Sequence, residues 1–171
     1  MPVIVPLEPG ESTVNAVIEQ ASAADAADIA AMVGELLNEI MTVIGEPAFN
    51  FDAGQTAARA RDFIDSAKYT VFLARADGGG RVAGFIALYE SYALYAEGAF
   101  GTIPELYVRP EFRSAGIGKR LVDAAAEHAR RREWTRLEVT TPPLPQFERT
   151  LRFYERQGFS VSGGRKLKLA V

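Results

Sequence analysis

The stretch RSAGIGKRL, residues 113–121, combines residue types that could bind an anion. Gly116 and Gly118 stand directly before a segment with helical spacing. The first backbone N–H groups of a helix have no helical partner and lie at the positive end of the helix dipole, and glycine lets a bulky anion approach them closely. Three cations flank the glycines: Arg113, Lys119 and Arg120. The pattern predicts an anion-binding loop at the start of a helix.

Two familiar glycine-rich loops do not fit this stretch. A Walker A loop would need glycine at Arg113 and serine or threonine at Arg120. The dinucleotide-binding fingerprint would need a third glycine where Leu121 stands. The sequence therefore predicts neither a nucleoside triphosphate nor NAD as the ligand.

The elements that would hold this loop follow from hydrophobic spacing and turn residues. Alternating or β-branched stretches predict strands at residues 13–22, 69–76, 81–91, 99–108 and 135–141, with a short closing hairpin at 159–163 and 165–171. Helical spacing predicts helices at residues 22–44, 52–68, 117–132 and 145–157.

One residue in the strand at 99–108 breaks its regularity. Pro104 lies where a central strand needs the N–H that proline lacks, so we expect a β-bulge or an edge there. We predict one mixed α/β (α+β) domain over residues 14–171, with a largely antiparallel sheet and a local parallel pair where a helix connects two strands. Residues 1–13 contain three prolines and are predicted to form an N-terminal arm.

Composition narrows the class of protein. The chain has 171 residues, of which 48% are hydrophobic, enough for a sizeable core. Its net charge of -3 argues against a general nucleic-acid binder, and it has no cysteine for disulfides, thiolate metal sites or nucleophilic catalysis. No apolar run reaches the ~20 residues of a membrane span, and the N-terminus lacks a basic signal region. We therefore predict a cytoplasmic protein.

The element order and two motifs resemble the GCN5-related N-acetyltransferase (GNAT) superfamily. The motif R-x-x-G-x-G at residues 113–118, after the strand end ELYVRPEF, resembles the family's acyl-CoA loop. The segment LRFYERQGF, residues 151–159, is similar to the family's FYxxxGF helix end. The resemblance covers the chain from about Val14 to the C-terminus and implies a GNAT-like fold of six to seven strands and about four helices, with a β-bulge in the fourth strand.

This resemblance also implies acetyl-CoA as co-substrate. The loop and its flanking cations would bind the CoA pyrophosphate through Arg113, Ser114, Ala115, Gly116, Ile117, Gly118, Lys119 and Arg120. Splaying of the preceding strand would free backbone amides for the pantetheine arm and the developing oxyanion, at Leu106, Tyr107 or Val108. Many relatives have an asparagine where Phe147 stands, so its polar contact to the pantetheine arm or ribose is either missing here or replaced, for example by Thr140 or Thr141.

Acetylation of an amine needs a base for the amine proton and an acid for the leaving thiolate. Glu105, beside the expected bulge, is the predicted base, because the family often has an acidic residue there. The alternatives are a half-exposed strand carboxylate and a water chain as the base. Tyr154 matches the tyrosine near the CoA sulfur in many relatives and is the predicted acid. It also continues the helical stripe of Phe147 and Leu151, so a core tyrosine is the alternative.

The sequence says least about the acceptor. Acidic and aromatic residues on the first helix and in two connections would favour a cationic amine, although helix glutamates are usually solvated. These residues are Glu35, Asn38, Glu39, Glu46, Phe49, Phe51, Tyr89, Tyr92 and Tyr95. The single histidine, His128, is expected to be half-buried and structural, and no metal is predicted.

We therefore predict an acetyl-CoA-dependent N-acetyltransferase that acts on a primary amine of a small molecule or peptide, by direct attack in a ternary complex. A catalytically inactive acyl-CoA-binding regulatory module is the alternative, and an enzyme for longer acyl chains is a third. Neither a nucleic acid nor a membrane is expected as a partner. The sequence leaves the acceptor, the acyl length and the oligomeric state open, a homodimer included.

Overall fold

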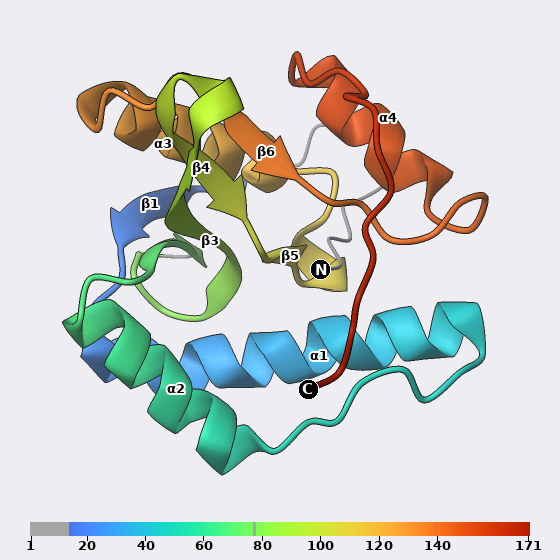
Figure 1. Cartoon of the computed structure of the whole chain (residues 1–171). Coiled ribbons are helices and arrows are strands. Elements are labelled where there is room, and N and C mark those ends of the chain that lie inside the picture. Colours follow the sequence, from blue (N-terminus) through green and yellow to red (C-terminus); the bar gives the residue numbers. More distant parts are fainter. Residues whose placement is uncertain (1–13, 77) are drawn as a thin grey trace.

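A six-stranded mixed sheet forms the centre of the computed structural model, which describes residues 14–76 and 78–171 (Figure 1). Its strands are β1 Ala16–Gln20, β2 Thr70–Ala76, β3 Val82–Ala93, β4 Gly98–Ile103, β5 Leu106–Val108 and β6 Leu137–Val139. The order is β1-β2-β3-β4-β6, and β5 pairs with β3. All pairs are antiparallel except β4 and β6. The predicted antiparallel sheet with one parallel pair is confirmed.

Helices cover both faces of this sheet. The helices α1, Ala26–Ile44, and α2, Ala53–Asp65, lie together along one side (Figure 1). The helices α3, Ile117–Arg131, and α4, Glu148–Arg156, contribute to the core of the other face. Short 3-10 turns occupy Ala23–Asp25, Leu94–Ala96 and Pro110–Phe112. In the described part of the chain, none of the helices has both the length and the apolar run that a membrane span requires.

Helix α3 buries one apolar stripe against the sheet. Its residues are Ile117, Leu121, Val122, Ala125 and Ala129. They pack on the same core as residues of β2, β3 and β5. This packing fixes the start of α3 at the end of β5 that carries the glycine loop.

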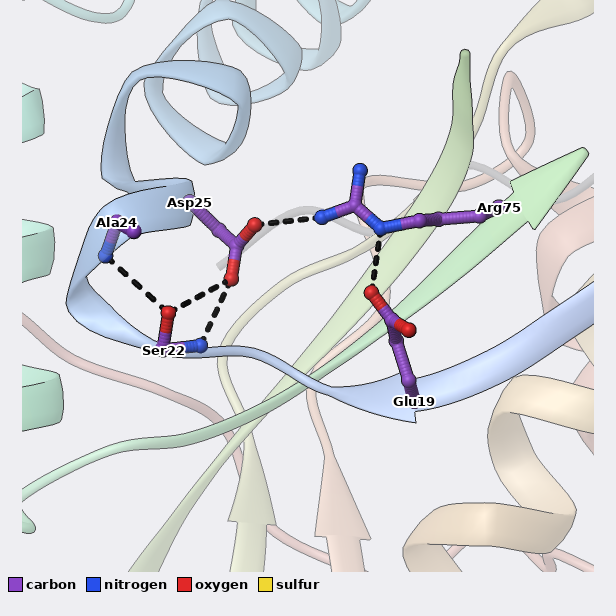
Figure 2. Close-up of polar contacts among 5 residues, drawn as sticks. All are labelled: Glu19, Ser22, Ala24, Asp25 and Arg75. Carbon is purple, nitrogen blue, oxygen red and sulfur yellow. Dashed lines mark hydrogen bonds and ion pairs between the residues drawn. The ribbon is translucent and has the colours of Figure 1, made fainter. Parts of the chain in front are cut away.

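A capping box closes the 3-10 turn Ala23–Asp25, which leads directly into α1, and it is linked to the sheet (Figure 2). The Ser22 backbone N–H donates to Asp25 Oδ2 at 2.8 Å, and the Ala24 N–H donates to Ser22 Oγ at 3.3 Å. Arg75 of β2 then donates through Nη2 to Asp25 Oδ1 at 2.5 Å and through Nε to Glu19 of β1. Helix α1 is thus tied to two strands at its N-terminus.

The predicted bulge lies between β4 and β5. Tyr89 pairs with Thr102, whereas Ile86 pairs with Leu106, so three steps along β3 match four along the neighbouring chain. The extra residue falls at Pro104 and Glu105, and the Ala87 N–H donates to the Glu105 carbonyl at 2.9 Å. This one-residue shift reverses which face the following side chains point to.

The two closing strands predicted after Gly158 are not formed. Residues 160–171 contain no strand and are exposed throughout. A strand here would bury little apolar surface to offset the entropy of ordering its backbone, and Gly163 and Gly164 interrupt it. The predicted arm at residues 1–13 lies outside the described residues.

Candidate active site

The bulge directs Glu105 into a cavity of about 260 Å³ between α1, α2 and the sheet. Removal from water raises the pKa of the Glu105 carboxyl to about 7, because the ionised form loses hydration. No hydrogen bond from the described residues offsets this effect. A carboxyl with such a pKa is partly ionised at neutral pH and can both accept and release a proton.

Tyr69, which the sequence analysis did not single out, lies near this carboxyl. Burial and the charge of Glu105 both raise the pKa of the Tyr69 hydroxyl, so the phenol stays protonated. Its ring stacks on Tyr89 with centroids 5.9 Å apart. Its position directly before β2 was the only sequence signal, and only the fold brings it beside the bulge.

Beyond the bulge, β5 leaves one edge open. The Arg109 N–H donates to the Ala83 carbonyl at 2.8 Å, and Phe85 stands opposite Tyr107. Alternation along an antiparallel pair then turns the backbone groups of Leu106 and Val108 away from β3. β6 pairs with β4 only as far as Ile103 opposite Val139. The predicted splaying is therefore present, and the outward-facing amides are those of Leu106 and Val108, whereas that of Tyr107 faces β3.

Tyr154 of α4 is buried on the opposite face from Glu105, in the core that also contains Leu106 and Val108. Its side chain is 1% exposed, and its hydroxyl has no hydrogen-bond partner in the described chain. Phe153 and Phe159 contact its ring edge-to-face, with centroids 5.3 and 5.1 Å away. Burial raises the pKa of this hydroxyl well above its ordinary value. Buried hydroxyls are normally paired, so this hydroxyl retains an unused hydrogen-bonding capacity within the described chain.

The glycine loop has the backbone geometry of an anion site. Gly116 is the N-cap of α3 with a φ of 71°, and as a glycine it places no side chain of its own over the first turn of the helix. A Cβ on Gly116 would meet nothing within 4 Å, so the space around it is open. Ser114 also has a positive φ of 71°. Gly118 and Ile117 are buried, whereas Lys119 and Arg120 are exposed, and Lys119 Nζ lies 2.6 Å from Asp123.

Arg113 is engaged inside the protein. Its guanidinium donates to both carboxylate oxygens of Glu39, at 2.8 and 2.6 Å, and to the Val108 carbonyl at 2.8 Å. It also lies over the Tyr107 ring, 5.5 Å from the centroid. Arg113 therefore secures the loop to α1 and to β5.

A second arginine, Arg109, forms a similar ion pair with Glu35, which lies one turn of α1 before Glu39. Arg109 Nη2 and Nε donate to Glu35 at 2.9 and 3.0 Å, and Nη1 donates to the Val82 carbonyl at 2.8 Å. Hydrogen bonding to Glu35 is the main cause that raises the pKa of Arg109. The sequence signal was the matching spacing of the two glutamates and the two arginines, four residues apart in each case.

The residues that the sequence suggested for the acceptor site therefore lie in several different places and do not form one site. Glu35 and Glu39 form ion pairs with Arg109 and Arg113, and Glu46 is exposed beyond the end of α1. Phe49 and Phe51 line the Glu105 cavity. Tyr92 and Tyr95 are exposed elsewhere, and Tyr95 borders a second cleft.

That second cleft, of about 1100 Å³, lies between β6, α4, the end of α3 and residues 158–166. Tyr154, Thr140 and Thr141 line it. Phe147 is the N-cap of α4 and is 4% exposed, packed in the core on the α1 side. His128 lies half-buried against Phe72 and Trp134, as expected of a structural histidine.

These features fit a CoA thioester. The open surroundings of Gly116 leave room for a diphosphate, and the outward amides of Leu106 and Val108 leave hydrogen bonds for an extended chain. The unpaired Tyr154 hydroxyl leaves a donor for a sulfur or an oxygen.

The bulged and splayed sheet with a glycine loop at the start of α3 is the architecture of an acetyltransferase. The chain belongs to the acetyltransferase (GNAT) family, whose model matches residues 33–159. The predicted family and fold class are thereby confirmed, with six strands and four α-helices in the described residues.

Solved structures agree with this assignment at the level of the fold. A ribosomal-protein-alanine N-acetyltransferase from Brucella melitensis biovar Abortus 2308 is 21% identical, with a TM-score of 0.68 and coverage of 91% of this chain and 99% of that chain. An acetyltransferase from Trypanosoma brucei is 22% identical, with a TM-score of 0.67 and coverage of 92% and 100%. An aminoglycoside acetyltransferase from an uncultured soil metagenomic sample is 16% identical, with a TM-score of 0.69 and coverage of 91% and 95%. No curated protein sequence matches the chain.

Proposed function

We propose that the protein transfers the acetyl group of acetyl-CoA to a primary amine, by direct attack of the amine in a ternary complex. The observation that carries this proposal is the presence of two suitable groups, Glu105 on one face of the splayed sheet and Tyr154 on the other. One is a carboxyl with a pKa raised to about 7, and the other is a buried hydroxyl without a partner. Family membership and the amine acceptors in the names of two similar structures support it.

Binding of the co-substrate falls to the loop and the open strand edge. The N–H groups around Gly116 to Lys119 would hold the diphosphate, since the helix start supplies unpaired donors and partial positive charge. Exposed Arg120 and Lys119 would add charge-assisted contacts. Arg113 would act through the position of the loop, because Glu39 already engages its guanidinium.

Glu105 would accept the amine proton. A lysine-like ammonium has a pKa near 10.4, so at neutral pH its proton must pass to a base before the nitrogen can attack. The Glu105 carboxylate, which burial shields from bulk solvent, is matched to this task by its pKa of about 7. When bound, acetyl-CoA supplies the thioester carbonyl that the neutral amine attacks.

Tyr154, on the opposite face of the sheet from Glu105, would provide the proton for the leaving CoA thiolate. Its hydroxyl stays protonated at neutral pH because burial raises its pKa, so Oη can donate to the thiolate as the carbon–sulfur bond breaks. The proton that the acylated nitrogen then loses would pass through solvent and restore the phenol. The outward amides of Leu106 and Val108 would donate to an oxygen that gains negative charge.

The test is thiol release from acetyl-CoA across a panel of primary amines, together with calorimetric titration of acetyl-CoA. We expect binding by the parent protein, loss of binding in Gly116→Glu, and binding within a few-fold of the parent in Gly116→Ala. Both variants carry the same left-handed backbone strain at a φ of 71°, so the longer, negatively charged side chain of glutamate is what separates them. Unchanged binding in Gly116→Glu would exclude the loop as the diphosphate site.

Two other results would redirect the proposal. Acetyl-CoA binding without thiol release on any amine would favour the regulatory module. Tighter binding of a longer acyl-CoA would change the donor, and the loop and Tyr154 would keep their roles.

A further inference from the structure

The cavity beside Glu105 has an unusually apolar lining for a site that would receive an amine. Its walls come from α1, the connection after α1, α2, β2 and β3. Among the lining residues the charged ones are Glu105 and Arg59. Most of the others are apolar or aromatic, and the aromatic ones are Phe49, Phe51, Phe63, Tyr69 and Phe85.

The carboxylates that could have made the cavity acidic point elsewhere. Glu35 binds Arg109 at 2.9 Å and Glu39 binds Arg113 at 2.6 Å, so α1 offers neither charge to a ligand. Arg59 is exposed, and its guanidinium donates to Gln55 Oε1 at 3.3 Å. A positive group therefore borders the side open to solvent.

The size and charge of the cavity together restrict the acceptor. A volume of about 260 Å³ lies below the usual range of roughly 300–1,000 Å³ for ligand sites. A second ammonium in such a space would lie against an apolar wall or near Arg59, without a carboxylate to pair with, and an unpaired buried charge is unfavourable. A single amine can reach Glu105 while its apolar body displaces water from the aromatic walls.

We infer that the acceptor is a compact amine with one cationic nitrogen on an apolar or aromatic body, which enters between α1 and α2 with its nitrogen at Glu105. This inference rests on the proposed acetyl transfer. It distinguishes this chain from enzymes whose acceptors carry several ammonium groups.

The glycine at position 34 supports a dedicated pocket. A Cβ on Gly34 would lie 2.6 Å from the Phe51 ring, so the absence of a side chain in the middle of α1 is what lets Phe51 lie against the helix. Phe51 is 40% exposed and thus stands at the boundary between the cavity and solvent.

Hexylamine and 1,6-diaminohexane provide a matched test, because they share a six-carbon chain and differ by one ammonium. Thiol release from acetyl-CoA is measured with each amine. Calorimetric binding of each amine to the CoA-saturated protein is measured in parallel. We expect kcat/KM and affinity at least tenfold higher for hexylamine, and similar acceptance of 2-phenylethylamine.

Three variants test whether the preference for hexylamine arises in the Glu105 cavity. Phe51→Ala should raise KM for hexylamine about fivefold and leave KM for acetyl-CoA unchanged. Tyr92→Ala, which removes an exposed aromatic outside the cavity, is the matched control and should change neither. Arg59→Glu should narrow the preference for hexylamine, since it replaces the repelling cation with a partner for the second ammonium.

The outcomes separate the two proposals. Equal or better use of the diamine would overturn the inference and leave acetyl transfer standing. Preferential binding of hexylamine without turnover of any amine would remove the proposed function and retain the inferred chemistry of the cavity. Binding of neither amine would overturn the inference.

Discussion

Glu39 of α1 and Arg113 of the glycine loop form a two-point ion pair, with Nη1–Oε1 and Nη2–Oε2 distances of 2.8 and 2.6 Å. The two side chains are 26% and 16% exposed, so the pair is partly shielded from water. Because the same guanidinium also binds the Val108 carbonyl, one arginine joins α1, the open strand β5 and the glycine loop.

Replacement of Glu39 by alanine should destabilise the folded protein, because it removes the ion pair with Arg113. We expect the free energy of unfolding to fall by about 1–2 kcal/mol, because a partly buried guanidinium loses its partner. Urea unfolding measures this change. Glu46→Ala, on an exposed residue past the end of α1, is the control and should stay within about 0.5 kcal/mol of the parent.

The same pair also tests how Arg113 serves the loop. If Arg113 acts through loop position, Glu39→Ala and Arg113→Ala should weaken acetyl-CoA binding by similar factors, and the double variant should add little further loss. A far larger loss in Arg113→Ala than in Glu39→Ala would show that the guanidinium itself contacts the diphosphate.

Glu105→Gln should abolish one limb of the pH–rate profile. The base must be ionised, so kcat/KM of the parent should rise as pH increases through about 7, the pKa of the Glu105 carboxyl. The variant should lose this limb and roughly 100-fold or more in kcat, the usual contribution of a general base. A retained limb near pH 7 would assign the base to a water chain.

The same substitution has a consequence for stability. The folded pKa of Glu105, about 7, lies above its ordinary value of 4.5, so the folded state holds the proton more tightly than the unfolded chain. The parent should therefore lose stability as pH rises from 4.5 through 7, whereas Glu105→Gln should not. Relative to the parent, the variant should gain about 1–3 kcal/mol between pH 5 and pH 8, measured by urea unfolding.

A constant stability difference across this range would contradict the burial of an uncompensated carboxyl. Asp65→Asn, at the exposed end of α2, is a matched control for the loss of one negative charge. Its difference from the parent should show no step near pH 7.

Tyr154→Phe separates catalysis from packing. Removal of an unpaired buried hydroxyl should leave stability unchanged or raise it by about 1 kcal/mol, because nothing in the described chain pairs with it. The kcat should fall roughly 10- to 100-fold if the hydroxyl protonates the leaving thiolate, with little change in acetyl-CoA affinity. Thermal unfolding and steady-state kinetics measure the two effects. Full activity with altered stability would reduce Tyr154 to a core residue.

Local signals in the sequence determined much of this protein. The bulge at Pro104, the capping box of Ser22 and Asp25 and the buried stripe of α3 all follow from short-range chemistry: a missing N–H, a side chain that meets a nearby amide, and a 3.6-residue period. Residues 113–118 predicted the family for the same reason, because a loop motif is contiguous. The closing hairpin was predicted wrongly, since alternation alone supplies no surface to bury.

Only the tertiary structure decided how charges and hydroxyls are partnered. Glu39 is equally consistent in sequence with a solvated helix or an acidic acceptor site, and its pairing with Arg113 spans 74 residues of chain. The desolvation of Glu105 and the unpaired state of the Tyr154 hydroxyl likewise depend on which described segments the fold packs around them. Ion pairing and desolvation at these residues arise because the fold brings distant segments of the chain together. They therefore leave no local pattern in the sequence.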